Sequence, residues 1–271
     1  MHPKVSGVAD ILNKIVQTKW QEIAQAKENQ PLETLQARCH DLPPTRGFAD
    51  ALAQSPPIRL IAEVKKASPS AGLIREDFDP AMIAQAYQRG GASCLSVLTD
   101  QQYFQGDLSY LQLIRDSVSL PLLRKDFIVD PYQVYEARVA GADAILLIAE
   151  CLDAANMKEL HDLAVDLGMD VLIELHSPDN LPKVLATGTR LVGVNNRDLH
   201  NFQVDTQRTL DIRKEVPTTQ LVVGESGVRD RQLVEQWQQA GINAMLVGES
   251  LMRKPDIESA VRELLGTETE N

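Results

Sequence analysis

Short apolar runs rich in Val, Ile and Leu recur along most of this chain, and a helical pattern follows each of them. This alternation is typical of parallel strands joined by crossover helices. The runs stay apolar nearly throughout, as expected of strands that are buried on both faces. Eight runs are present: Arg59 to Lys65, Cys94 to Thr99, Leu120 to Phe127, Ala144 to Ala149, Val171 to His176, Leu191 to Asn196, Leu221 to Glu225 and Ala244 to Gly248.

Eight equivalent βα units favour closure into a (β/α)8 TIM barrel over residues 59–271, with an open doubly wound sheet as the alternative. The chain has neither GxGxxG after its first run nor GxxxxGK[ST], so the nucleotide-binding signatures of open sheets are absent and the barrel is favoured. Asp79-Pro80 and Asp130-Pro131 offer an N-cap and a first-turn proline to two helices. Six glycines mark expected helix ends: Gly90, Gly141, Gly168, Gly188, Gly241 and Gly266.

Residues 1–58 have a different character, because they contain helical rather than strand patterns. A second helix is predicted from Pro31, and the segment 41–47 is rich in turn residues and too short for a domain linker. We therefore expect an N-terminal helical extension that packs on the barrel and forms one structural domain with it. One face of its first amphipathic helix is marked by Ile11, Leu12, Ile15, Val16, Trp20 and Ile23.

The overall charge argues against partners that are themselves polyanions. The chain has 27 Lys and Arg against 38 Asp and Glu, a formal net charge of −11. Such a surface repels phosphate backbones and anionic lipid headgroups, so neither a nucleic-acid partner nor a membrane partner is expected. No signal-peptide core is evident, and no apolar run approaches the roughly 18 residues of a membrane span.

Cysteine and histidine give no support to disulfides or to metal catalysis. Cys39, Cys94 and Cys151 lie far apart without CxxC spacing, which points to a cytoplasmic protein. The five histidines form no HExxH or comparable cluster, so no metal site is predicted. Only His176 lies near the predicted barrel mouth, where a structural role is favoured over a catalytic one.

Charged side chains gather where the predicted strands end, which is the face that carries the active site in barrels of this kind. Side chains two positions apart on a strand point the same way, whereas Lys66 and Arg124 have the opposite parity and face away. Buried charges are costly unless they are paired or functional, so an internal ion-pair network is the alternative to a site. The pairs are Glu63 with Lys65, Lys125 with Phe127, Glu174 with His176, and Asn195 with Arg197.

The last two runs end in small residues, at Gly224-Glu-Ser-Gly227 and Gly248-Glu-Ser250. Small residues there let backbone N–H groups approach an anion, as in the phosphate site that barrels place after their last two strands. Two ordinary tight turns are the alternative interpretation. Neither segment has the GxSxG pattern of a serine hydrolase.

Several segments closely resemble the indole-3-glycerol phosphate synthase family, and in the same order along nearly the whole chain. They are Ile61-Ala-Glu-Val-Lys-Lys-Ala-Ser-Pro-Ser70, Leu122-Leu-Arg-Lys-Asp-Phe-Ile-Val-Asp130, Leu172-Ile-Glu-Leu-His176, Val192-Gly-Val-Asn-Asn-Arg-Asp-Leu199, Gly224-Glu-Ser-Gly227 and Leu246-Val-Gly-Glu-Ser-Leu-Met252. The family also carries an N-terminal helical extension. The resemblance implies a carboxy-lyase of tryptophan biosynthesis that needs no cofactor. Its substrate is 1-(2-carboxyphenylamino)-1-deoxyribulose 5-phosphate, which closes a ring and loses CO2 and water.

The resemblance also implies catalytic roles for four residues of this sequence. Lys125 matches the family's general acid, which protonates the substrate carbonyl oxygen, and Glu174 matches its general base for dehydration. Glu63 would stabilise the cationic intermediate and align Lys125. Lys65 would contact the anionic substrate, and the division of the last proton transfers among Glu63, Lys65 and Glu174 stays open.

Further matches supply binding residues. Asn195 and Arg197 match residues near the substrate carboxylate and hydroxyls, and Glu225 matches a hydroxyl-binding acid. Ser68 would shape a mobile loop after the first strand, over the stretch 67–77. The phosphate would bind Lys65 and the backbone of Ser226, Gly227, Gly248 and Glu249, whose own carboxylate we expect to turn away. The aromatic ring would lie against Pro69, Phe104, Phe127 and Leu146.

Two other functions stay open on the sequence alone. One is another phosphosugar barrel, such as an isomerase of aminated ribulose phosphates, which would bind its phosphate at the same ends of the last two runs. That function would not explain why Glu63, Lys125 and Glu174 occur together. A binding protein that senses a phosphorylated metabolite is the second alternative. The expected partner in each case is a small anionic phosphosugar. We expect a monomer, with association with other tryptophan-pathway enzymes possible.

Overall fold

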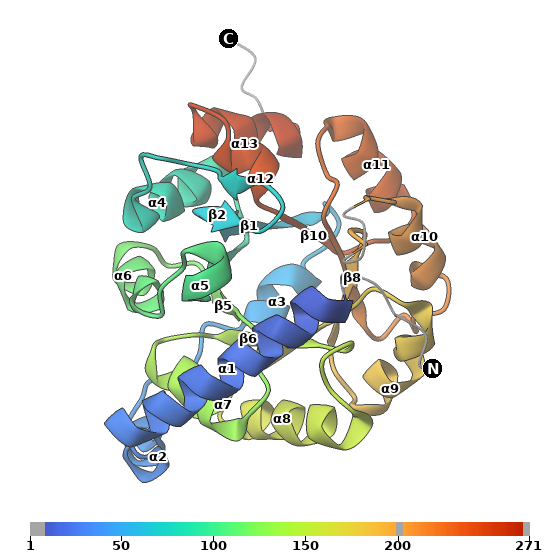
Figure 1. The fold of residues 1–271 in the computed structure, drawn as a ribbon. Helices are drawn as coiled ribbons and strands as arrows, with labels where there is room; N and C mark the ends of the chain where they lie inside the picture. The colour runs from blue at the N-terminus through green and yellow to red at the C-terminus, as the bar shows by residue number, and fades with distance from the viewer. Residues whose placement is uncertain (1–8, 199–202, 268–271) are drawn as a thin grey trace.

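The computed structural model describes residues 9–198 and 203–267, and these form a closed barrel of parallel strands (Figure 1). Each strand hydrogen-bonds to its neighbours in chain order, and β1 closes the ring against β10. The predicted TIM barrel is therefore confirmed. Its strands are β1 (Arg59–Val64), β4 (Cys94–Leu98), β5 (Leu122–Lys125), β6 (Ala144–Ile148), β7 (Asp170–Leu175), β8 (Leu191–Asn195), β9 (Leu221–Glu225) and β10 (Ala244–Val247).

Strand β5 is shorter than the apolar run that predicted it. Pro121 has no N–H to donate to a ladder, so the strand begins only at Leu122. At the other end the Asp126 carboxylate accepts the backbone N–H of Phe127 at 2.8 Å. That local bond replaces a ladder bond, and the chain leaves the sheet after Lys125.

The helices surround the barrel, and most of them begin and end near the predicted residues. Asp79 accepts the N–H of Met82, and Asp130 forms a capping box with Gln133. Five of the six predicted glycines have a positive φ, whereas Gly90 ends its helix and the left-handed position falls to Gly91. The helices are α4 (Pro80–Gly90), α5 (Gln101–Phe104), α6 (Ser109–Ser117), α7 (Pro131–Val139), α8 (Ala154–Asp166), the 3-10 turn η1 (Pro178–Asn180), α9 (Leu181–Ala186), α10 (Gln207–Arg213), α11 (Arg231–Gln239), α12 (Glu249–Met252) and α13 (Ile257–Leu265).

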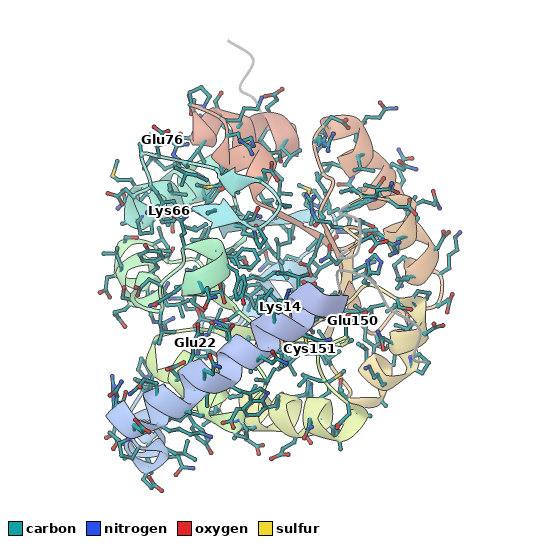
Figure 2. The ribbon with its side chains drawn as sticks, viewed as in Figure 1. Lys14, Glu22, Lys66, Glu76, Glu150 and Cys151 are labelled. Carbon is teal, nitrogen blue, oxygen red and sulfur yellow. The ribbon has the colours of Figure 1, made fainter. Side chains whose placement is uncertain are left out.

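The N-terminal segment reaches both ends of the barrel. Helix α1 (Ala9–Asn29) crosses the mouth diagonally, and α2 (Leu32–His40) follows at the side (Figure 1). Ile15 and Ile23 of α1 are buried as predicted, but the Trp20 side chain on the same helix is 48% exposed. Figure 2 shows Lys14 and Glu22 on the part of α1 that crosses the mouth.

A third helix, α3 (Phe48–Ala53), closes the opposite end of the barrel and was not predicted. Its Phe48, Ala49 and Leu52 side chains are fully buried and pack with the inward-facing side chains of the strands. The Arg46 guanidinium just before it donates to the carbonyls of Arg115, Val118 and Leu120. Helix α3 thus fills the barrel's floor with apolar side chains.

The segment after β1 forms a short antiparallel hairpin at the mouth. Strands β2 (Ala67–Ser68) and β3 (Gly72–Leu73) pair there, so part of the expected loop is regular. None of the helices within the described residues combines the length and hydropathy that a membrane span needs.

Candidate active site

The mouth of the barrel holds a cavity of about 460 Å³ beneath α1, at the carboxyl ends of the strands. Its wall includes every site residue predicted from the sequence. These are Glu63, Lys65, Ser68, Pro69, Phe104, Lys125, Phe127, Leu146, Glu174, Asn195, Arg197, Glu225, Ser226, Gly227, Gly248 and Glu249. Strand alternation explains much of the gathering, because Glu63, Lys125, Glu174, Asn195 and Glu225 point inward from the ends of their strands.

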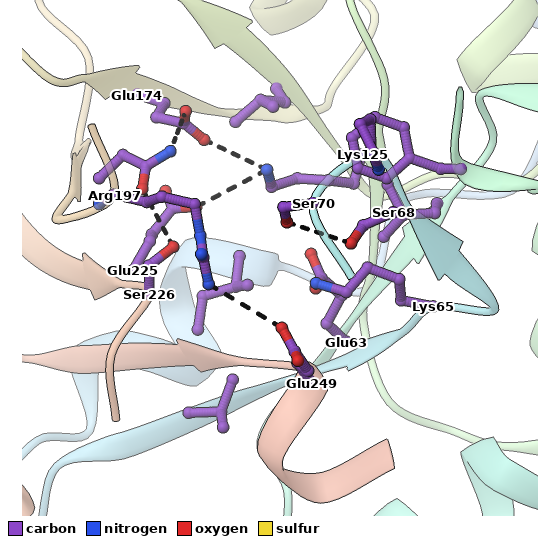
Figure 3. Close-up of a pocket in the computed structure, with 18 of the residues that line it drawn as sticks. Glu63, Lys65, Ser68, Ser70, Lys125, Glu174, Arg197, Glu225, Ser226 and Glu249 are labelled. Atoms are coloured by element: carbon purple, nitrogen blue, oxygen red, sulfur yellow. Dashed lines mark hydrogen bonds and ion pairs between the residues drawn. The ribbon is translucent and has the colours of Figure 1, made fainter. Parts of the chain in front are cut away.

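Lys125 occupies the centre of this site, between two glutamates (Figure 3). Its Nζ lies 3.2 Å from Oε2 of Glu174 and 3.7 Å from Oε2 of Glu225. The other oxygen of Glu174 accepts the Asn195 side-chain amide at 2.9 Å. Three strands, β5, β7 and β9, therefore bring one cation and two carboxylates within contact distance.

Charge coupling sets the protonation states of this cluster. Burial by itself lowers the pKa of Lys125, but Glu174, Glu225 and Glu63 together raise it above its usual value. Burial by itself raises the pKa of Glu174, but Lys125 and Asn195 bring it below the usual value. Burial and the neighbouring Glu174 raise the pKa of Glu225 well above its usual value, against the effect of Lys125. These shifts favour the charged form of Lys125, the ionised form of Glu174 and the protonated form of Glu225.

A second ion pair comes from the end of β1. The Lys65 ammonium donates to the carboxylate of Glu63, a residue that is itself buried. Gly248 faces this pair so closely that a Cβ there would overlap Oε2 of Glu63. Glycine at this position therefore lets β10 end directly beside the carboxylate of β1.

The turn after β9 takes a rare backbone conformation at the cavity wall. Ser226 has a φ of 65° and Gly227 a φ of 92°. A Cβ on Gly227 would lie 2.5 Å from Cγ1 of Val204. The Ser226 hydroxyl donates to Oδ1 of Asn195 at 3.0 Å, which fixes the turn against β8. Consecutive positive φ values at a functional cavity point to a backbone shaped for a ligand.

The expected orientation of Glu249 is wrong in this structure. Its carboxylate faces Arg197 across the cavity rim, with Nη2 of Arg197 at 3.9 Å from Oε2 (Figure 3). Arg253 donates to Oε1 of the same carboxylate at 3.0 Å. The expectation rested on repulsion of a phosphate, whereas two guanidinium groups compensate the negative charge here.

An apolar wall faces the charged cluster. The rings of Phe104 and Phe127 lie 6.1 Å apart between centroids, at an interplanar angle of 37°. Beside them, α1 contributes three side chains that were predicted only as one face of an amphipathic helix: Ile11, Leu12 and Ile15. Sequence reasoning could not assign them to the cavity, because nothing local shows which surface that helix covers.

Two cations of the cavity wall were also missed, Arg229 and Arg253. They lie outside the strands, where side-chain alternation does not predict which way a side chain points. Arg229 follows β9, and Arg253 follows β10 and α12. The available signal was therefore that each arginine lies only a few residues after a Gly-rich strand end.

Residues of the opposite parity lie elsewhere, as predicted. Arg124 is buried on the outside of the barrel and pairs with Glu136 of α7 at 2.8 Å. His176 has the same parity as Glu174 and was expected beside it, but it is not among the residues that line the cavity. Its Nδ1 atom lies 3.0 Å from the Asn195 carbonyl oxygen, so the ring contacts the backbone of β8. Within the described residues, no group of three or more His, Cys, Asp or Glu side chains is arranged to hold a metal ion.

Solved structures with similar architecture include a 3-hexulose-6-phosphate synthase and a mutant tryptophan synthase alpha-subunit from Pyrococcus furiosus. The first is 15% identical, with a TM-score of 0.64 over 78% of this chain and 99% of that chain. The second is 17% identical, with a TM-score of 0.59 over 77% and 98%. At these identities the likeness concerns the fold alone.

Sequence comparison is more specific. The indole-3-glycerol phosphate synthase family model matches residues 12–264. The indole-3-glycerol phosphate synthase of Rhodopirellula baltica is 54% identical over 257 residues, which cover 95% of this chain and 99% of that protein. This chain therefore belongs to the indole-3-glycerol phosphate synthase family.

Proposed function

We propose that this protein is an indole-3-glycerol phosphate synthase and that Lys125 is its general acid. The enzyme converts 1-(2-carboxyphenylamino)-1-deoxyribulose 5-phosphate to indole-3-glycerol phosphate, CO2 and water, in tryptophan biosynthesis. One observation carries the assignment of roles: Nζ of Lys125 lies 3.2 Å from Glu174 within a cavity that has an aromatic wall. A protonated amine beside an ionised carboxylate is suited to acid–base chemistry on a bound carbonyl compound.

In the first step the aromatic carbon that bears the carboxylate attacks the substrate ketone. A C–C bond forms, and the carbonyl oxygen takes a proton from Lys125 and becomes a hydroxyl group. The adjacent Glu63 stabilises the cation that develops on the substrate nitrogen. Loss of CO2 then returns the C–C bonding electrons to the ring, which neutralises that cation.

Dehydration completes the reaction. Glu174 accepts a proton from the intermediate, and the hydroxyl group leaves as water after it receives a proton from Lys65. The ion pair between Lys65 and Glu63 keeps that ammonium group inside the cavity. Both groups come from strand ends, which hold reacting groups more precisely than loops do.

Recognition of the substrate divides the cavity into two parts. The phosphate binds Lys65 and the backbone N–H groups of Ser226, Gly227, Gly248 and Glu249. Arg197 and Asn195 bind the carboxylate and the sugar hydroxyls, and the protonated Glu225 also binds a hydroxyl. The aromatic ring lies against Pro69, Phe104, Phe127 and Leu146, beneath the hairpin that contains Ser68.

We also propose that the working unit of the enzyme is a monomer. The thiols of Cys39, Cys94 and Cys151 are free, which suits a cytoplasmic enzyme. Contacts of α1 and α3 with opposite ends of the barrel support the proposal that the extension and the barrel form one structural domain. Gel filtration with light scattering would test the proposed monomer, because a dimer would have twice the molar mass of the chain.

The test of function is an assay without added metal or cofactor. Purified protein is mixed with the substrate, and the indole chromophore is followed. Lys125→Met should abolish turnover and leave substrate binding largely intact, whereas Lys66→Met, a matched control of opposite strand parity, should remain active. A well-folded wild-type protein that forms no indole would overturn the assignment. Isomerisation of another aminated ribulose phosphate, or binding without chemistry, would identify the alternatives.

A further inference from the structure

Lys19 lies on α1, outside the catalytic cluster, yet its side chain is only 3% exposed. Its Nζ contacts three carboxylates: Asp100 at 2.7 Å, Asp126 at 3.0 Å and Glu22 at 2.8 Å. Asp100 and Asp126 are themselves almost fully buried. Burial by itself lowers the pKa of Lys19, but these aspartates raise it, so the lysine stays charged.

Asp126 connects Lys19 to the segment that contains the general acid. It follows Lys125 and precedes Phe127 directly, and one of its oxygens accepts the N–H of Phe127 at 2.8 Å. The other oxygen accepts the hydroxyl of Thr99 at 2.6 Å. The backbone N–H of Phe127 is therefore bound by a carboxylate that two cations contact, Lys19 at 3.0 Å and Arg124 at 3.1 Å.

Asp100 connects Lys19 to the other aromatic side chain of the wall. Its Oδ1 caps α5 by accepting the N–H groups of Tyr103 and Phe104 at 2.7 and 3.2 Å. Its Oδ2 contacts Lys19. The hydroxyls of Thr18 and Tyr103 lie 3.0 Å apart, which adds a second contact between α1 and α5.

We propose that Lys19 is a positioning residue that joins α1 to the loops after β4 and β5 and so holds Phe104 and Phe127 as the wall for the substrate's aromatic ring. This inference rests on the proposed function, because the ring is that of the substrate named above. An apolar residue at position 19 could fill the same space, but it could not bind two buried carboxylates at once.

The proposal predicts an effect on one part of the cavity. The ion pairs of Lys19 reach the loops after β4 and β5 and its own helix, whereas the residues proposed to bind the phosphate follow β1, β9 and β10. Loss of Lys19 should therefore weaken binding of the aromatic part of the substrate and spare the phosphate part. Because the wall contacts the ring before and during the reaction, KM should change more than kcat.

The experiment compares Lys19→Met with Lys27→Met, a control on the same helix whose ion pair with Asp130 is partly exposed. The readouts are kcat, KM for the substrate, and the inhibition constant of inorganic phosphate. We expect KM to rise at least about tenfold for Lys19→Met, with kcat changing less and the phosphate constant staying within about twofold. Lys19→Arg should recover most of the lost affinity, because it restores the charge.

Three outcomes would overturn the inference. They are kinetic constants equal to those of Lys27→Met with only a lower melting temperature, a phosphate constant that rises in proportion to KM, and a loss confined to kcat. If Lys19→Met does not fold, Asp100→Asn replaces it, since Asn preserves the α5 cap and removes only the ion pair. An unchanged KM in folded Asp100→Asn would equally contradict the role. A wild type without turnover would instead refute the proposed function.

Discussion

The carboxylate of Glu174 and the ammonium group of Lys125 lie 3.2 Å apart although 49 residues separate them in the chain. Glu225 stands on the other side of the lysine, at 3.7 Å. One cation therefore lies between two buried carboxyl groups. The pKa of Glu174 is lowered, whereas the pKa of Glu225 is raised. This asymmetry gives the first prediction.

Substitution by glutamine should be tolerated far better at Glu225 than at Glu174. Burial and the nearby Glu174 raise the pKa of Glu225 well above its usual value, which favours its neutral form, and an amide can mimic a neutral carboxyl group. Glu225→Gln should keep kcat within about tenfold, whereas Glu174→Gln should lose about 100-fold or more as a missing general base. Steady-state assays at neutral pH measure both, and equal losses would show that Glu225 acts in its ionised form.

Gly248→Ala should damage catalysis more than folding. The new Cβ would overlap Oε2 of Glu63, so the ion pair between Glu63 and Lys65 must move. We expect kcat/KM to fall about 10- to 100-fold, the range typical of displaced catalytic groups. Gly188→Ala, at a helix end with a φ of +81°, strains the backbone away from the cavity and is the control for a loss of stability without a displaced ion pair. Equal kinetics of the two variants would contradict the prediction.

Asp126 should make the free energy of unfolding fall as the pH becomes acidic. Burial raises its pKa, but Arg124 and Lys19 outweigh this and lower it from 3.8 to about 2. Because this pKa is lower in the folded state, Asp126 stabilises the fold by about 2 kcal/mol at any pH above its pKa in the unfolded chain. This stabilisation is lost as the pH falls toward 2.

The check is urea unfolding of the wild type and Asp126→Asn at several pH values. We expect the difference in unfolding free energy to shrink by about 1 kcal/mol between about pH 6 and about pH 3. A difference that stays constant over this range would mean that Asp126 has the same pKa in both states.

Phe48→Ala should destabilise the protein and leave the active site intact. The ring is fully buried in the floor of the barrel, at the end opposite to the cavity. Removing it should cost about 3–5 kcal/mol of unfolding free energy. Trp20→Ala, on the half-exposed side of α1, should cost about 0.5 kcal/mol. A change in the KM of folded Phe48→Ala would show that the two ends of the barrel are coupled.

Much of this protein was predictable because its strands follow simple local rules. A run that is buried on both faces must be apolar, so the barrel strands stand out in the sequence. Alternation then fixes which of two adjacent charges faces inward, as with Lys125 against Arg124. Most runs extend one residue past the observed strand, and β5 differs most, with two residues fewer at each end. Pro121 precedes its first residue, and the Asp126 carboxylate binds the N–H of Phe127 just after its last.

The tertiary structure decided whatever depends on contacts between distant segments. An amphipathic pattern shows that α1 has a buried face but not which surface it covers, so the cavity contacts of Ile11 and the buried position of Lys19 were not predictable. The orientation of Glu249 likewise follows from two arginines that approach it in space. The sequence by itself determined the barrel, the family and the inward-facing residues, because period-two alternation and short motifs are local. Helix placement and ion-pair partners are set by packing between segments, so only the folded chain determines them.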